Sequence, residues 1–328
     1  MKRALALATA LPLLLAAQGD VPELILPIAC TLGQNCAVQN YVDADPSPAA
    51  RDFHCGGRTY DKHGGTDIRL SSMAVQRQGI AVLAAAAGTV LRVRDGVADI
   101  SVRETGVAAV AKVQCGNAVV IEHAGGLETQ YCHMAKGSIA VKPGQRVTAG
   151  TPIGKVGLSG ETEYPHLHIS VRKDGQQVDP FALGAGPGQC DGGRNIWAAS
   201  SGLRGAYQTG QVLVAGFSTA PVTMAAAQQR GADQQPRPSR AGPALIAFVQ
   251  TIGLQRGDVQ RLTVSAPNGA LLAEGRAEPL DRDKAQNIIF SGKKRPQEGW
   301  APGRYAARYV VLRGGKAAID HRFAFLLP

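Results

Sequence analysis

Aromatic residues are scarce in this chain of 328 residues, of which Phe, Trp and Tyr together make up only 5%. Charged residues are also few, at 18%, whereas apolar residues reach 45%, and this balance excludes a disordered chain. Glycine follows no strict three-residue period, which excludes a collagen-like chain. No segment is apolar over the ~20 residues that span a membrane. The sequence therefore predicts a folded protein with no membrane span in its mature form.

Glycine is the residue in excess: 40 of the 328 residues are glycine, about 12% against a usual ~7%. An interior glycine costs a helix ~1 kcal/mol relative to alanine, so the excess argues against a helical bundle and favours strands joined by tight turns. At ~100–200 residues per domain, the length predicts two domains. The formal net charge of +10 is compatible with an anionic partner. No nucleic-acid-binding motif accompanies that charge, and we expect no nucleic acid to bind.

The N-terminus is typical of a secretory signal peptide. Lys2 and Arg3 precede an apolar run over residues 4–17, which ends in small residues, and the chain becomes polar at Gln18. A run of this length is too short for a membrane anchor. We therefore expect residues 1–17 to be a signal peptide and the protein to be exported, to the periplasm, the cell envelope or the medium.

Cysteines are even in number, six in all, and in an exported chain they are expected to form disulfides. A structural zinc cluster is not indicated, because no Cys-x2-Cys pair occurs. Sequence proximity favours two pairs, Cys30 with Cys36 and Cys115 with Cys132. Cys55 and Cys190 are left over.

The organisation of the chain predicts a mostly β protein. Between residues 79 and 183, short β-branched runs end repeatedly at Gly or Asp-Gly, which is typical of antiparallel strands. Similar short strands return in the last third of the chain and predict a small β-sandwich domain. The expected segments are a Cys-containing extension over 18–55, the first domain over 56–183, a Gly-rich linker over 184–205 and the sandwich over 206–328.

Turn residues place individual hairpins within these domains. The glycine-containing segment 124–126 separates two strand-like runs, and the Asn-Gly step at 268–269 is a strong hairpin turn. A Gly-Gly step at 314–315 leads into the last strand. The polar stretch 228–242 is predicted to be a mobile loop within the sandwich.

Two short motifs contain residues that bind metals. In His63-Gly-Gly-Thr-Asp67 an imidazole and a carboxylate lie four residues apart, and His166-Leu-His168 holds two imidazoles at positions i and i+2. In a strand these two positions point to one face, ~6–7 Å apart. Two imidazoles and one carboxylate suit Zn²⁺ and leave one position open for water or substrate. Each motif alone is more often a local hydrogen bond or ordinary packing, but their joint occurrence in an exported β-rich protein favours a catalytic metal site.

These motifs stand among others in an order that resembles the lysostaphin/LytM-type zinc metallopeptidases of family M23. The resemblance covers roughly residues 56–183 and implies the antiparallel β-sheet fold of that peptidase domain. It rests on five segments: His63-Gly-Gly-Thr-Asp67-Ile, Tyr131-Cys-His133-Met, residues 141–154, residues 157–160 and Pro165-His166-Leu-His168-Ile-Ser-Val171.

The resemblance implies a role for five residues. His63, Asp67 and His168 would bind zinc, while His133 and His166 would stand beside the metal without binding it. Zinc lowers the pKa of a bound water from 15.7 to about 7 and polarises a carbonyl group. Because no His-Glu-x-x-His helix supplies a glutamate, a neutral histidine is expected to act as the base. We assign that role to His166 and the stabilisation of the oxyanion to His133, although the two roles could be exchanged.

Four further residues are candidates for the surroundings of the site. Tyr60 and Tyr164 flank the two motifs and could line a substrate groove, with ordinary packing as the alternative. Glu122 and Glu161 could hold an imidazole in one tautomer, with solvated surface charge as the alternative.

The resemblance implies a zinc metallo-endopeptidase that hydrolyses peptide cross-links of bacterial peptidoglycan. The alternative is a non-catalytic M23-fold regulator or activator of another cell-wall hydrolase. Such relatives lack one or more of the histidine and aspartate residues, and here all five positions are filled. A lipoyl or biotinyl carrier domain shares the turn pattern of residues 141–154 but requires a lysine at an upstream hairpin tip, and none occurs between Lys112 and Lys136. The expected partners are peptidoglycan peptides, with an envelope regulatory partner for the C-terminal domain as a further possibility.

Overall fold

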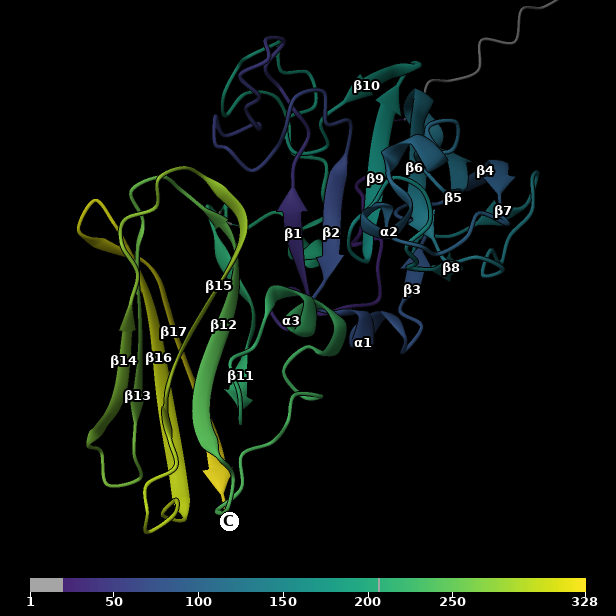
Figure 1. Ribbon diagram of the computed structural model, residues 1–328. Helices are drawn as coiled ribbons and strands as arrows, with labels where there is room; N and C mark the ends of the chain where they lie inside the picture. Colours follow the sequence, from purple (N-terminus) through teal and green to yellow (C-terminus); the bar gives the residue numbers. More distant parts are fainter. Residues whose placement is uncertain (1–19, 206) are drawn as a thin grey trace, which may run out of the picture.

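A computed structural model describes residues 20–205 and 207–328 of the chain; the expected signal peptide over 1–17 lies outside them. The fold is mostly β, as predicted, and every pair of hydrogen-bonded strands in the described residues is antiparallel. One large sheet comes from the first part of the chain and two sheets come from the last part (Figure 1). Of the helices in these residues, none has the length and apolar character that a membrane crossing requires.

The first sheet has eight strands, in the order β1-β2-β9-β6-β5-β4-β7, with β10 paired to β9. A separate two-stranded sheet, β3-β8, accompanies it. The strands of these two sheets are β1 (Cys36–Asn40), β2 (Thr66–Leu70), β3 (Ala81–Leu83), β4 (Gly88–Arg94), β5 (Asn117–Glu122), β6 (Leu127–Met134), β7 (Arg146–Val147), β8 (Pro152–Lys155), β9 (His166–Lys173) and β10 (Gln176–Val178).

Strand β9 shows why the sheet has one apolar and one polar face. Leu167, Ile169 and Val171 are fully buried in the core of this part of the chain. The alternate residues His166 and His168 point to the opposite face, because side chains alternate along a strand. The polar face of β9 is therefore the one that carries the histidine motif.

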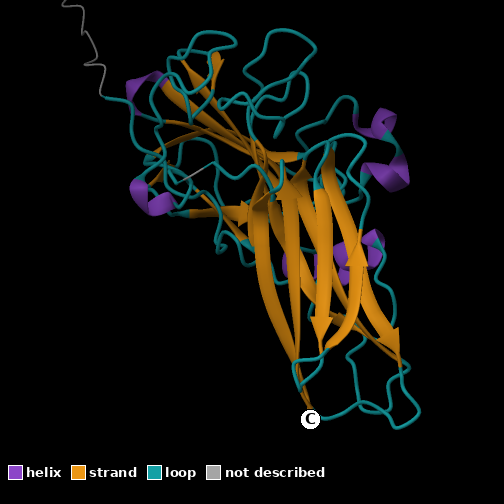
Figure 2. Cartoon of the chain, turned by 90° about the vertical axis from the view of Figure 1, so that its left-hand side faces the viewer, coloured by secondary structure: helices purple, strands orange, loops and turns teal. Residues whose placement is uncertain are grey.

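The last part of the chain forms two sheets that face each other, of three strands (β11-β12-β15) and four strands (β14-β13-β16-β17) (Figure 2). The predicted turns at 268–269 and 314–315 join β13 to β14 and β16 to β17, so both hairpins are confirmed, as is the β5–β6 hairpin at 124–126. The strands are β11 (Gln211–Ser218), β12 (Ala244–Leu254), β13 (Val259–Ser265), β14 (Leu271–Arg276), β15 (Lys284–Lys294), β16 (Gly303–Arg313) and β17 (Lys316–Leu327).

Helices are short and lie between the strands. Ser72 and Thr223 cap the first and the last α-helix, each by accepting a hydrogen bond from a backbone N–H in the first turn. The α-helices are α1 (Met73–Gln76), α2 (Val102–Thr105) and α3 (Met224–Arg230), and the 3₁₀ turns are η1 (Val107–Val110), η2 (Ala124–Gly126) and η3 (Ala199–Ser201).

Strand β12 is buried along its whole length because both of its faces are covered. On one face, Leu245 and Val249 pack into the sandwich core with residues of the four-stranded sheet. On the other, Phe248 and Ile252 pack with Ala37 of β1 in a separate apolar cluster. The sandwich is therefore joined to the first sheet through β1.

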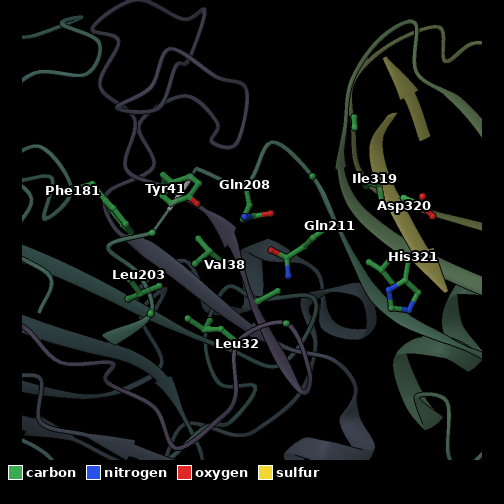
Figure 3. Close-up of a pocket in the computed structure, with 17 residues that line it drawn as sticks. Leu32, Val38, Tyr41, Phe181, Leu203, Gln208, Gln211, Ile319, Asp320 and His321 are labelled. Atoms are coloured by element: carbon green, nitrogen blue, oxygen red, sulfur yellow. The ribbon is translucent and has the colours of Figure 1, made fainter. Parts of the chain in front are cut away.

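Arg58 reinforces this junction on the polar side. Its buried guanidinium donates to the backbone carbonyls of Val38 and Gln39, on the outermost strand of the first sheet, and to that of Gln208, which leads into β11. A hollow of about 510 Å³ lies beside the junction, between Val38 and Tyr41 on one side and β17 on the other (Figure 3).

Three disulfides link all six cysteines. Cys30–Cys36 and Cys115–Cys132 are present as predicted, and the two cysteines left over, Cys55 and Cys190, form the third bridge.

Three expected segments contain structure that their sequence did not indicate. The extension over 18–55 contains β1, a full member of the sheet, since its pairing with β2 is a long-range contact that leaves little trace in the sequence. In the expected linker over 184–205, Ile196 and Trp197 are buried in the first core. Helix α3 extends into the expected loop at 228–242, whose polar residues give little helical pattern.

Candidate metal centre

The register between β2 and β9 places two of the predicted ligands side by side. Asp67 is paired with His168 across the two strands, so both side chains point to the polar face of the sheet. His63 approaches from the loop before β2. Its Nε2 lies 3.2 Å from Asp67 Oδ2 and 3.2 Å from His168 Nδ1, and His168 Nδ1 lies 2.8 Å from Asp67 Oδ1. His63 and Asp67 are buried, and His168 is partly exposed.

These three side chains fit a zinc ion. Ligand atoms of one tetrahedral zinc, with bonds of ~2.0–2.1 Å, lie about 3.3 Å apart. The three separations of 2.8–3.2 Å are close to that value. Two nitrogen donors and one carboxylate are a donor set that zinc accepts, and one position remains for a further ligand. The group can therefore hold a metal with little rearrangement.

Neighbouring groups fix the orientation of each ligand. His63 Nδ1 lies 2.6 Å from the carbonyl of Tyr41 and donates to it, so Nε2 is left to face the group. His168 Nε2 lies 3.0 Å from Ser170 Oγ, which leaves Nδ1 for the group. The Asn40 amide donates to Asp67 Oδ2 at 2.9 Å. Such outer contacts select the tautomer of a ligand and hold it in place.

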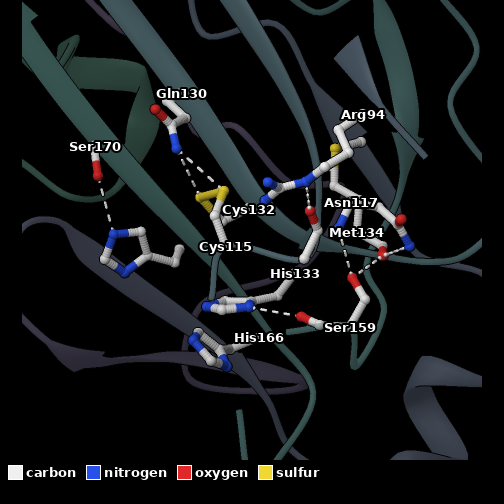
Figure 4. Close-up of a disulfide and its surroundings, with 12 residues drawn as sticks. Arg94, Cys115, Asn117, Gln130, Cys132, His133, Met134, Ser159, His166 and Ser170 are labelled. Atoms are coloured by element: carbon white, nitrogen blue, oxygen red, sulfur yellow. Dashed lines mark hydrogen bonds between the residues drawn. A yellow bond between two sulfur atoms is a disulfide. The ribbon is translucent and has the colours of Figure 1, made fainter. Parts of the chain in front are cut away.

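His133 and His166 lie next to the group, with ring centroids 4.6 Å apart (Figure 4). His133 Nδ1 donates to the Ser159 carbonyl at 2.8 Å, and His166 Nδ1 donates to the Tyr164 carbonyl at 3.0 Å. Each ring therefore keeps its Nε2 as the atom that can accept a proton. His166 Nε2 lies 3.5 Å from Asp67 Oδ1.

The backbone at His133 is unusual, since its φ is +61°, in the region that residues other than glycine rarely adopt. Strict alternation along β6 would place His133 on the core face with Tyr131, which is fully buried in the core. The positive φ instead turns the imidazole towards His166. Backbone strain of this kind is concentrated at functional sites.

Burial sets the charges of these groups. Burial, together with the neighbouring imidazoles of His166 and His168, holds the pKa of His133 well below its ordinary value. Burial also lowers the pKa of His166, against the opposing effect of Asp67. For Asp67, burial opposes ionisation, but the imidazoles of His63 and His166 outweigh it and hold the pKa of the carboxyl well below its usual range. The site thus combines an ionised carboxylate with two imidazoles that are neutral at neutral pH.

The family model of peptidase family M23 matches residues 61–180. This range contains the three candidate ligands and the two neighbouring histidines. Residues 61–180 form an M23 peptidase domain.

Curated relatives match parts of this M23 domain. The "DD-carboxypeptidase/endopeptidase Mpg" of Neisseria meningitidis serogroup B is 44% identical over 68 residues, which are 21% of this chain and 15% of the relative. The "Peptidoglycan DD-endopeptidase ShyA" of Vibrio cholerae is 42% identical over 64 residues, 20% of this chain and 14% of the relative. The matched stretches thus span about 15% of the length of these relatives.

Solved structures similar to this chain include M23 proteins. One is the catalytic domain of the prophage-encoded M23 protein EnpA from Enterococcus faecalis, with 26% identity, a TM-score of 0.31 and coverage of 50% of this chain and 97% of that one. Another is a zinc containing peptidase from Vibrio cholerae, with 27% identity, a TM-score of 0.28 and coverage of 43% and 38%.

The four candidates for the surroundings of the site fall into two groups. Among the described residues, the imidazoles are held by backbone carbonyls and by Ser170, whereas Glu161 accepts from Gln114 and Glu122 is exposed. Tyr60 and Tyr164 do lie beside the site, with ring centroids 4.5 Å from His63 and 5.2 Å from His166. Asn40 also supports the site, and nothing in the sequence connects it with a motif that begins more than twenty residues later.

Proposed function

We propose that this protein is a zinc metallo-endopeptidase that hydrolyses peptide cross-links of bacterial peptidoglycan. The observation that carries the proposal is the group of His63, Asp67 and His168, whose donor atoms fit one zinc ion within an M23 domain. The relatives named above support the substrate, because the names of two include endopeptidase activity and one names peptidoglycan. Export to the cell envelope would place the protein beside that polymer, and we propose that location as well.

The proposed reaction gives each of the two neighbouring histidines a role. A zinc ion held here would acidify a water molecule and polarise the scissile carbonyl. His166 presents an unprotonated Nε2 beside the ligand group, so we assign it as the base that takes the proton of the water and delivers it to the leaving amine. We assign the stabilisation of the oxyanion to His133: because its Nδ1–H donates to the Ser159 carbonyl, its Nε2 must take up a proton from solvent as negative charge develops on that oxygen. Because both rings have the same arrangement of Nδ1, exchange of the two roles remains part of the proposal.

A regulator of another cell-wall hydrolase is the second candidate function. The sandwich lies outside the residues that match the peptidase family, and in this second proposal it is the part that binds an envelope partner. All five histidine and aspartate residues are nevertheless present and brought together, which favours catalysis. We therefore place the regulator second.

Digestion of purified sacculi tests the proposal. The zinc-loaded protein is expected to release new amine groups from sacculi, and EDTA is expected to stop the release. His63→Ala and His168→Ala should lose bound zinc, whereas His133→Ala should keep zinc and lose turnover, with zinc measured by elemental analysis. Sacculi left intact by fully zinc-loaded protein would instead favour the regulator. Mass spectrometry of the released fragments would identify the bond.

A further inference from the structure

Arg69 is a fully buried cation without an anionic partner. It is 1% exposed, and among the described residues no carboxylate lies within ion-pair distance of it. Its guanidinium donates to the amide oxygens of Gln39, at 3.0 Å, and Gln286, at 3.1 Å. It also lies 3.9 Å from the centre of the Tyr164 ring, and its Nε–H has no hydrogen-bond partner.

Such an arrangement is uncommon, because buried arginines are almost always paired with an acid. A guanidinium is not deprotonated in proteins, so Arg69 carries a positive charge in this buried position. Glu163 directly precedes Tyr164, whose ring contacts Arg69, but its carboxylate forms an ion pair with Arg103. In the part of the chain that the structure describes, Arg69 is therefore not paired with an acid.

Arg69 lies on the polar face of β2, two residues beyond Asp67, and is paired with His166 of β9. Two residues along a strand correspond to ~6–7 Å. One extended peptide residue spans ~3.5 Å, so two residues of a bound peptide cover the same distance. If the peptide is cleaved at the ligand group, the substrate residue that reaches Arg69 therefore lies within about two positions of the scissile bond.

The cover over Arg69 is built from neutral side chains. Gln286 belongs to β15 of the sandwich and is only half-buried, and its Oε1 also accepts from Gln228 Nε2 at 2.9 Å. A carboxylate oxygen carries a charge that an amide oxygen lacks, and a carboxylate can accept two parallel hydrogen bonds from one guanidinium, so it binds a guanidinium more strongly than an amide does. An incoming carboxylate can therefore take the place of the Gln286 amide on Arg69.

We propose that Arg69 is a specificity-determining residue that binds a free carboxylate of the wall peptide, within about two residues of the scissile bond. The proposal rests on the proposed peptidase function and adds a substrate class to it: peptides with a free carboxylate near the cleaved bond are preferred. Gln286, from the sandwich, is the side chain that the carboxylate displaces.

Binding of a matched peptide pair tests the proposal. The probes are two fluorescein-labelled wall pentapeptides that differ only in the C-terminal group, a carboxylate in one and a carboxamide in the other. Binding to the full-length protein is measured by fluorescence anisotropy in EDTA, so that neither turnover nor a metal–carboxylate bond contributes. The carboxylate forms an ion pair with Arg69 where the carboxamide offers only a neutral acceptor, and this difference predicts about tenfold tighter binding of the carboxylate peptide.

The decisive variant is Gln286→Glu, which is nearly isosteric and gives Arg69 a carboxylate of its own. We expect the tenfold preference to fall to about one in this variant. Gln229→Glu is the matched control, since it adds the same charge on the exposed surface of the neighbouring helix α3 and should keep the preference. Equal binding of the two peptides by the wild-type protein would overturn the proposal, and so would a preference that survives Gln286→Glu.

Substitutions of Arg69 itself give a second test of the proposal. Arg69→Lys keeps the charge and should keep part of the preference, whereas Arg69→Met should lose it; thermal melts show which variants are folded. The two proposals fail in different ways. A protein that digests sacculi but binds both peptides equally refutes the carboxylate site alone, and one that prefers the carboxylate but leaves sacculi intact refutes the peptidase alone.

Discussion

Gly64 and Gly65, adjacent in the His63-Gly-Gly-Thr-Asp67 motif, differ sharply in what surrounds them. A Cβ added at Gly65 would lie 2.5 Å from His168 Nε2 and 2.6 Å from the carbonyl oxygen of Ile169. A Cβ at Gly64 would meet only the end of the Gln177 side chain, at 2.6 Å. Gln177 is exposed and flexible, whereas His168 and the backbone of β9 are held in the sheet. Gly65→Ala should therefore disturb the ligand group, and Gly64→Ala should not.

The size of the effect follows from these distances. Ordinary contact with a Cβ begins at 3.4 Å, so His168 and Ile169 would each have to move by about 0.8–0.9 Å. Metal–ligand distances tolerate only ~0.2 Å. Loss of a single outer contact lowers metal affinity ~10–100-fold, and displacement of a ligand should cost at least as much. Overpacking is expected to destabilise Gly65→Ala by a further ~1–3 kcal/mol.

Competition with a chromophoric chelator measures the zinc affinity of both variants and the wild type, and thermal melts report folding. We expect Gly65→Ala to lose at least ~10-fold in zinc affinity while Gly64→Ala stays within about twofold. If Gly65→Ala bound zinc as tightly as the wild type, or if the two variants lost affinity equally, the placement of His168 would be wrong.

Three further changes test other parts of the structure. Asn40→Ala removes the amide that donates to Asp67 and should lower zinc affinity ~10–100-fold in the same competition assay; unchanged affinity would show that the contact does not hold the ligand. Burial raises the pKa of Asp179 to about 7, so its folded form keeps a proton that the unfolded chain loses near pH 4, and stability should fall as pH rises from about 4 to 7. Asp179→Asn should therefore lose less stability than the wild type between pH 5 and pH 8, by on the order of 2–4 kcal/mol, and parallel melting curves at the two pH values would contradict this. The Cys55–Cys190 bridge joins residues 135 positions apart, and replacing both cysteines by alanine should lower the free energy of urea unfolding by ~5 kcal/mol. A loss near zero would show that the bridge does not stabilise the fold by restricting the unfolded chain.

The parts of the site that could be predicted are those encoded by short-range patterns. The period of two along a strand places His166 and His168 on one face, and turn residues locate the hairpins. Local spacing also identified two of the three disulfides, whereas Cys55 and Cys190 are too far apart in the chain for any such argument.

Other features depend on contacts that sequence spacing does not reveal. Asn40 and Tyr41 support the ligands only because β1 pairs with β2, and the sequence around β1 shows little periodicity. The orientation of His133 depends on a backbone conformation that reverses the alternation of β6. Arg69 becomes conspicuous only when the side chains around it are seen to be neutral.

The guanidinium of Arg58 has a consequence for self-association. Strand β1 ends the eight-stranded sheet, and an outermost strand is where a second chain adds most readily, through unpaired backbone groups. Arg58 occupies the carbonyls of Val38 and Gln39, and the sandwich covers Ala37. A chain shortened to residues 20–205 would keep Arg58 on these carbonyls but would uncover Ala37 and the apolar surface around it, so self-association through that surface, rather than loss of the ligand group, would be its first defect.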